Sequence, residues 1–159
     1  MSYEKDRTWS DKYLPYVKKI VGQYLLEPSS MDEDCKHATD LIVLKARDMR
    51  IACRIRRPGY GNIYPHEFTI RSARDSGAET ELSKIINGFG DWLFYGHAKK
   101  EGIEVDPWFI INLHSFRAQL INNPDIITYF EKSNGDGTHF VAFDIRSFED
   151  KPEILIAKS

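Results

Sequence analysis

The chain has 159 residues, of which 42% are hydrophobic and 13% aromatic, and its formal net charge is -2 at pH 7. This composition is too apolar for a disordered chain, and the small net charge argues against a protein whose whole surface binds nucleic acid. Neither an apolar run of about 20 residues nor a secretory signal is present, so we expect a single cytoplasmic domain over residues 1–159 that does not enter a membrane. The two cysteines, Cys35 and Cys53, are too few for a disulfide framework or a four-cysteine zinc site.

The first half of the chain predicts a helix, a loop and three strands. Apolar residues at helical spacing predict a helix over 11–26 that begins near Tyr13 or Leu14, because Pro15 suits a first turn. Residues 27–39 form an acidic loop. Strands are predicted at 40–44, 50–57 and 67–71, and we expect that they can pair as an antiparallel meander. Their alternation places five side chains in the core: Ile51, Cys53, Ile55, Phe68 and Ile70.

The second half alternates between helices and strands. Ser76 and Glu79 match a capping box, which predicts a helix as far as about residue 87 that Gly88 ends. Further strands are predicted at 91–98, 108–113, 139–145 and 153–157, with a helix at 113–121 and a short helix from Pro124. The predicted fold is an α/β (α+β) domain with a central mixed sheet and flanking helices.

The pattern that points to chemistry is the polar face of the second and third strands. Residues 45–57 carry six lysine and arginine residues and one acidic residue. Arg54, Arg56 and Arg57 are the predicted substrate-binding residues, because guanidinium groups bind phosphate oxygens in pairs. Asp40 opens one strand and Glu67 opens a later one. Two such carboxylates beside a cation are typical of a phosphodiesterase in which Mg²⁺ activates the attacking water.

A helix, a strand that begins with Asp40, a second strand, a strand with Glu67, Thr69 and Arg71, and a helix follow one another over 11–98. This succession resembles the core of the PD-(D/E)xK nuclease-like superfamily. The resemblance implies a restriction-endonuclease-like core with Asp40 and Glu67 as metal ligands. Thr69 stands where the family has lysine, so the resemblance assigns the cationic role to Arg71 or to Lys84 on the following helix. The sequence is also similar to small phage or prophage proteins.

Three functions stay open at this point. The leading hypothesis is a Mg²⁺-dependent nuclease-like protein that acts on or binds nucleic-acid phosphodiesters. The second is a catalytically inactive module that binds a nucleotide or nucleic acid. The third is a phage-type anti-defence or virion-associated protein whose arginine-rich face docks an acidic protein partner. A purely structural alternative pairs Glu67 with Arg54 or Arg56 across the sheet.

Overall fold

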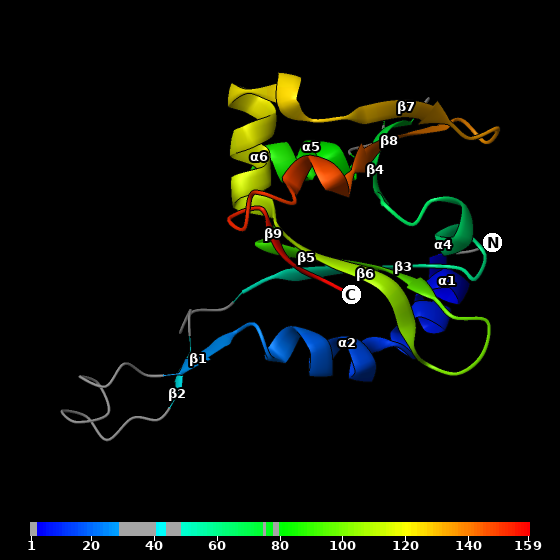
Figure 1. Cartoon of the computed structure of the whole chain (residues 1–159). Helices are drawn as coiled ribbons and strands as arrows, with labels where there is room; N and C mark the ends of the chain where they lie inside the picture. The colour runs from blue at the N-terminus through cyan, green and yellow to red at the C-terminus, as the bar shows by residue number, and fades with distance from the viewer. Residues whose placement is uncertain (1–2, 29–40, 44–48, 75, 78–79) are drawn as a thin grey trace. The chain divides into compact units, whose positions relative to one another are not determined.

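The computed structural model describes residues 3–28, 41–43, 49–74, 76–77 and 80–159 (Figure 1). The chain divides into two compact units, Met1–Met49 and Arg50–Ser159, and each is described by itself. The predicted mixed α/β class is confirmed, whereas the single domain over 1–159 stays a prediction. Among the described helices, none combines the length and the apolar character that crossing a bilayer requires.

The described part of the first unit contains two helices and two short strands. Helix α1 spans Tyr3–Asp11 and α2 spans Leu14–Gly22, with Pro15 in the first turn as predicted. Helix α2 is shorter than predicted, because the chain turns after Gly22 and then forms strand β1, Leu26–Pro28. Strand β1 pairs antiparallel with β2, Leu41–Val43. Residues 29–40, which hold most of the predicted acidic loop and Asp40, lie outside the described residues.

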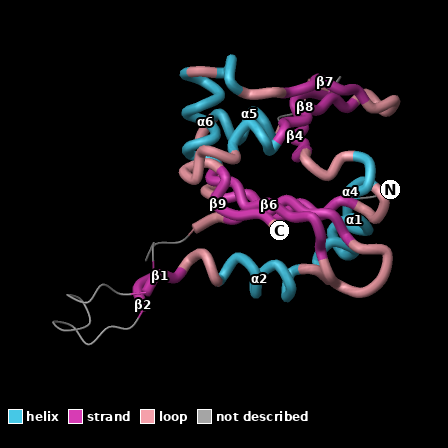
Figure 2. Tube along the Cα trace, in the orientation of Figure 1, coloured by secondary structure: helices cyan, strands magenta, loops and turns pink. Residues whose placement is uncertain are grey.

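The second unit is built from two sheets and their connections. Its elements are β3 (Ile51–Arg56), α4 (Tyr60–Ile63), β4 (Glu67–Arg74), α5 (Glu81–Ile86), β5 (Trp92–Ala98), β6 (Val105–Asn112), α6 (Leu113–Asn122), η1 (Pro124–Ile126), β7 (Tyr129–Ser133), β8 (Thr138–Asp144), η2 (Ile145–Phe148) and β9 (Leu155–Lys158). One sheet has the order β3-β5-β6-β9, and the other has the order β4-β8-β7. Figure 2 shows the two sheets as separate layers, and Figure 1 shows α5 and α6 beside β4 and β8.

Apolar side chains between the two sheets and the helices form the core of this unit. Phe68 lies near its centre, with ring-centroid distances of 5.3 Å to Phe143 and 5.6 Å to Phe116. Both Phe68 and Ile70 are fully buried, as the alternation predicted, and Ile55 is buried as well. The third strand of the sequence therefore turns its apolar face inward as predicted.

The predicted antiparallel meander is wrong. Strand β3 pairs in parallel with β5, whereas β4 pairs antiparallel with β8, so the two consecutive strands belong to different sheets. The short helix α4 lies between them in sequence and connects one sheet to the other. Because β3 is an edge strand, Cys53 is exposed and Ile51 only half-buried, which corrects their predicted place in the core. Neighbouring position in the sequence therefore does not decide which strands pair.

The helix after β4 begins later than the capping-box pattern predicted. Thr80 is the N-cap of α5, and its hydroxyl oxygen accepts a hydrogen bond from the Ser83 amide at 3.5 Å. Ser76 is exposed outside the helix, so its predicted role as the cap is wrong. The predicted end is confirmed: Gly88 has φ of +92° and its amide donates to the Ile85 carbonyl.

Candidate functional site

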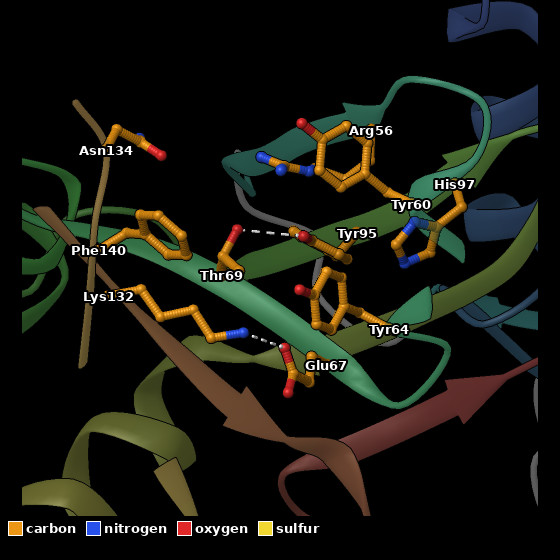
Figure 3. Close-up of a pocket in the computed structure, with 10 residues that line it drawn as sticks. All are labelled: Arg56, Tyr60, Tyr64, Glu67, Thr69, Tyr95, His97, Lys132, Asn134 and Phe140. Atoms are coloured by element: carbon orange, nitrogen blue, oxygen red, sulfur yellow. Dashed lines mark hydrogen bonds and ion pairs between the residues drawn. The ribbon is translucent and has the colours of Figure 1, made fainter. Parts of the chain in front are cut away.

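A pocket of about 140 Å³ opens between the two sheets of the second unit (Figure 3). Side chains from five strands and two connections line it: Arg56, Tyr60, Tyr64, Glu67, Thr69, Tyr95, His97, Lys132, Asn134 and Phe140. An apolar cavity of about 150 Å³ is large enough for benzene. The volume therefore suits one six-membered ring or one phosphate group, together with the open space in front of it.

Two tyrosines from the connection between the sheets form one side of this pocket. Tyr60 begins α4 and Tyr64 follows it, so a spacing of four residues on one helical turn brings both rings to the same side. Gly59, with φ of +100°, permits the sharp entry into that turn. The two tyrosines are 44% and 40% exposed, so their rings are available to a ligand.

A cation lies over each of these rings. The guanidinium carbon of Arg56 is 4.4 Å from the Tyr60 ring centroid, and the Lys132 ammonium is 4.2 Å from that of Tyr64. Lys132 also forms an ion pair with Glu67, with 3.2 Å between Nζ and Oε2 (Figure 3). Glu67 thus has a lysine partner from β7. Of its two predicted structural partners, Arg54 and Arg56, Arg54 pairs with Glu81 at 2.8 Å instead.

The inner wall of the pocket is polar and buried. The Thr69 and Tyr95 hydroxyl oxygens lie 3.1 Å apart and share a hydrogen bond. His97 is only 2% exposed, and neither of its ring nitrogens has a hydrogen-bond partner in the described structure. Burial, together with the nearby positive charge of Arg56, lowers the pKa of His97 from 6.5 to about 4, so the ring is neutral at pH 7.

The backbone of the Gly-rich turn packs directly on this histidine. A β-carbon at Gly61 would lie 3.0 Å from the β-carbon of His97, which is closer than such atoms normally approach. Glycine at this position therefore allows the turn that carries the two tyrosines to rest on the His97 side chain. A second hollow of about 530 Å³, lined by Lys99 and Lys100 among others, borders His97 as well.

The charges lining the pocket sum to a small positive value. Arg56 and Lys132 are cations, Glu67 is an anion and His97 is neutral at pH 7, which leaves a net charge of +1. The Glu67 carboxylate neutralises the charge of Lys132 through their ion pair. Arg56 lies over the Tyr60 ring, and no carboxylate is described beside it at the pocket. The arrangement suits a ligand that combines a flat ring with one negative charge.

The structure brings together three of the predicted site residues. Arg56, Glu67 and Thr69 line the pocket, although they come from two different sheets. The others are absent from its described lining: Arg54 pairs with Glu81, the Arg71 amide donates to the same Glu81 carboxylate, Lys84 is exposed on α5, and Arg57 follows β3. Arg54 and Arg56 on β3 and Arg71 on β4 belong to different sheets, so they do not share one sheet face. The binding roles predicted for these arginines stay predictions.

The predicted Mg²⁺ pair stays a prediction, because Asp40 lies outside the described residues. Within the described part of the chain, no group of three or more metal-ligating side chains occurs. The acid directly across the sheet from Glu67 is Asp144. Hydrogen bonds from the Arg146 guanidinium to both of its oxygens hold the pKa of Asp144 below its usual value.

Sequence reasoning missed most of the pocket. The only local signal was the segment 58–64, where two tyrosines four residues apart flank a Gly-rich turn. Lys132 had no such signal, since it lies 65 residues beyond Glu67 in the sequence. His97 is one of five histidines in the sequence, and no motif around it marks it as a site residue.

No model of a protein family matches this chain, and no match was found among curated proteins or among solved structures. The resemblance to the PD-(D/E)xK superfamily therefore stays an expectation.

Proposed function

We propose that residues 50–159 form a binding module for single-stranded nucleic acid or nucleotides, and that one nucleotide enters the pocket. The observation that carries this proposal is the pair of half-exposed tyrosine rings, Tyr60 and Tyr64, each with a cation within 4.4 Å of its centroid. Proteins that bind single strands combine stacking rings with positive charges that follow the phosphate backbone.

The tyrosine rings and the cations contact different parts of the ligand. A base stacks on a tyrosine face, which contributes about 1–3 kcal/mol per base in such proteins. The phosphate forms ion pairs with Arg56 and Lys132, and the Arg56 guanidinium donates paired hydrogen bonds to its oxygens. Glu67 competes with the phosphate for Lys132, because the lysine ammonium lies 3.2 Å from its carboxylate.

The same geometry weighs against docking of an acidic protein partner on an extended arginine surface. Arg54 already has Glu81 as its partner, and Arg56 lies over Tyr60 at the pocket. What the described residues offer is a concave site of one ring's size. Mg²⁺-dependent cleavage is the second candidate function, because the Glu67 carboxylate lines the pocket. A metal ion that acts on a bound phosphate would be held by such a carboxylate.

Binding of fluorescent single-stranded oligonucleotides, measured by anisotropy at several salt concentrations, tests the proposal. Tyr60→Ala and Tyr64→Ala are each expected to weaken binding about tenfold. Lys132→Ala is expected to weaken it and to lower the salt dependence by about one unit of slope. Glu67→Gln is expected to strengthen binding, because it removes a negative charge and leaves Lys132 to the phosphate.

Two substitutions outside the pocket are the matched controls. Tyr129→Ala removes a tyrosine that is 48% exposed on β7, and Lys158→Ala removes a lysine paired with Glu149. Both are expected to bind like the unaltered protein. If the unaltered protein binds no oligonucleotide at low salt, or the controls weaken binding as much as the pocket variants, the proposal is wrong.

The same oligonucleotide incubated with Mg²⁺ decides between binding and cleavage. Cleavage that Asp40→Asn and Glu67→Gln abolish, while binding persists, supports the nuclease. An intact oligonucleotide with normal binding leaves the binding module as the function.

A further inference from the structure

His97 is the buried group in the pocket that the proposed function does not yet use. It lies on β5 with 2% of its surface exposed, and both ring nitrogens lack a partner within the described residues. A buried polar atom without a hydrogen bond is unfavourable, so natural structures seldom retain one without a reason. Figure 3 shows the ring directed toward the space that the labelled tyrosines surround.

The chemistry of this ring selects an uncharged partner. A neutral imidazole presents one N–H donor and one lone-pair acceptor. A phosphate needs donors and positive charge, which Arg56 and Lys132 supply at the same pocket. The unpartnered nitrogens of His97 therefore suit the other half of a nucleotide, the edge of its base, where N–H and carbonyl groups are found.

The size of the pocket narrows the choice of base. About 140 Å³ accommodates one six-membered ring, whereas a purine adds a fused second ring. The backbone of Gly61 and the Tyr95 side chain pack against His97, so the ring has little room to move aside for a larger base.

We propose that the pocket is selective for a pyrimidine base and that His97 is its specificity-determining residue, which hydrogen-bonds to the polar edge of that base. This inference rests on the proposed function, because it requires that a nucleotide enters the pocket. It adds to that function a division of roles: the tyrosines stack, the cations bind the phosphate, and His97 recognises the base.

The test compares oligonucleotides that differ only in the group that His97 would recognise. Oligothymidylate is measured against an oligonucleotide in which difluorotoluene replaces thymine, since this ring keeps the shape of thymine but has much weaker hydrogen-bonding groups. Oligodeoxyadenylate and an abasic oligonucleotide complete the series. The unaltered protein is expected to bind oligothymidylate roughly fivefold to tenfold more tightly than the difluorotoluene analogue, and more tightly than oligodeoxyadenylate.

His97→Leu removes both nitrogens at similar volume. It is expected to bind thymine and difluorotoluene oligonucleotides equally, while the salt dependence that Arg56 and Lys132 produce is unchanged. Its melting temperature is expected to equal or exceed that of the unaltered protein, because an unpartnered buried polar group is replaced by an apolar one. A histidine with only a structural role would instead lower the melting temperature and leave the ratio of the two affinities unchanged.

The outcomes separate this inference from the proposed function. If the unaltered protein binds none of the oligonucleotides, the proposed function fails and this inference with it. If it binds all of them with the same affinity, nucleic-acid binding stands and selectivity through His97 is wrong, whatever the stability of the variant. A thymine preference that persists in His97→Leu also overturns the inference.

Discussion

In the proposed site, His97 would serve binding at the expense of stability. The ring is buried beside Arg56, whose positive charge and the surrounding apolar groups disfavour the imidazolium form. Burial without hydrogen bonds is unfavourable for the folded protein, yet it keeps the ring neutral and leaves both nitrogens without a partner among the described residues.

The lowered pKa of His97 makes the stability of the protein depend on pH. In the unfolded chain this histidine titrates near 6.5, whereas in the folded protein its pKa is about 4. Below pH 6.5 the unfolded state takes up a proton that folded His97 does not. The contribution of His97 to the free energy of unfolding is therefore fully present above pH 6.5 and decreases as the pH falls to about 4, by about 3 kcal/mol.

Urea denaturation of the unaltered protein and of His97→Leu at a series of pH values measures this contribution. The variant is expected to lose less stability between pH 6.5 and about 4, because it lacks the titrating group. Arg146 lowers the pKa of Asp144 from its usual value of 3.8, so protonation of Asp144 affects stability mainly below that pH. It therefore does not contribute to the difference between the two proteins above pH 4. If the free energies of unfolding of the two proteins change with pH in parallel, the lowered pKa of His97 is contradicted.

At the scale of single elements, the short turn α4 has the largest effect on the site. Its four residues carry the chain from β3 in one sheet toward β4 in the other, and they place Tyr60 and Tyr64 over the opening between the sheets. Both cations that accompany these rings come from strands, Arg56 from β3 and Lys132 from β7. The pocket thus depends on one turn and on the strands around it.

The N-terminus of α5 provides a test of how this element begins. Thr80→Ala removes a hydroxyl that accepts from the Ser83 amide and donates to the Ser72 carbonyl, so it is expected to lower the free energy of unfolding by about 1 kcal/mol. Ser76→Ala, outside the helix, is expected to change it by less than about 0.5 kcal/mol. Thermal unfolding of both variants checks this, and a larger loss for Ser76→Ala would place the cap at Ser76 instead.

At the scale of the second unit as a whole, one shared core joins the two sheets. Phe68 from β4 contacts the rings of Tyr95 from β5 and of Phe116 from α6, so its side chain links elements of both sheets and a helix. The pocket lies between the same two sheets. Its shape therefore depends on the packing that holds the sheets together.

Shortening Phe68 tests this dependence. Phe68→Ala is expected to lower the free energy of unfolding by about 3–5 kcal/mol, and Phe68→Leu by a smaller amount, because each leaves a cavity among buried rings. Ile63→Ala is the control, since Ile63 is 68% exposed, and is expected to change stability by less than about 0.5 kcal/mol. Urea denaturation measures all three, and equal losses for Phe68→Ala and Ile63→Ala would contradict a core centred on Phe68.

The sequence by itself determined the features that depend on neighbouring residues. Period-two alternation placed Phe68 and Ile70 in the core, Pro15 marked the start of α2, and Gly88 marked the end of α5. The mixed α/β class followed from the same local patterns. Such signals are readable because side-chain spacing and backbone preferences act within a few residues.

Only the tertiary structure decided which strands are neighbours, and with them the site. The alternation of apolar and polar residues does not predict that β3 pairs with β5 and β4 with β8, because many pairings bury the same apolar faces. That choice separated Arg54 from Glu67, exposed Cys53, and brought Lys132 to Glu67 across 65 residues of sequence. The pocket is a product of long-range packing, so a reading of adjacent residues recovered only part of it.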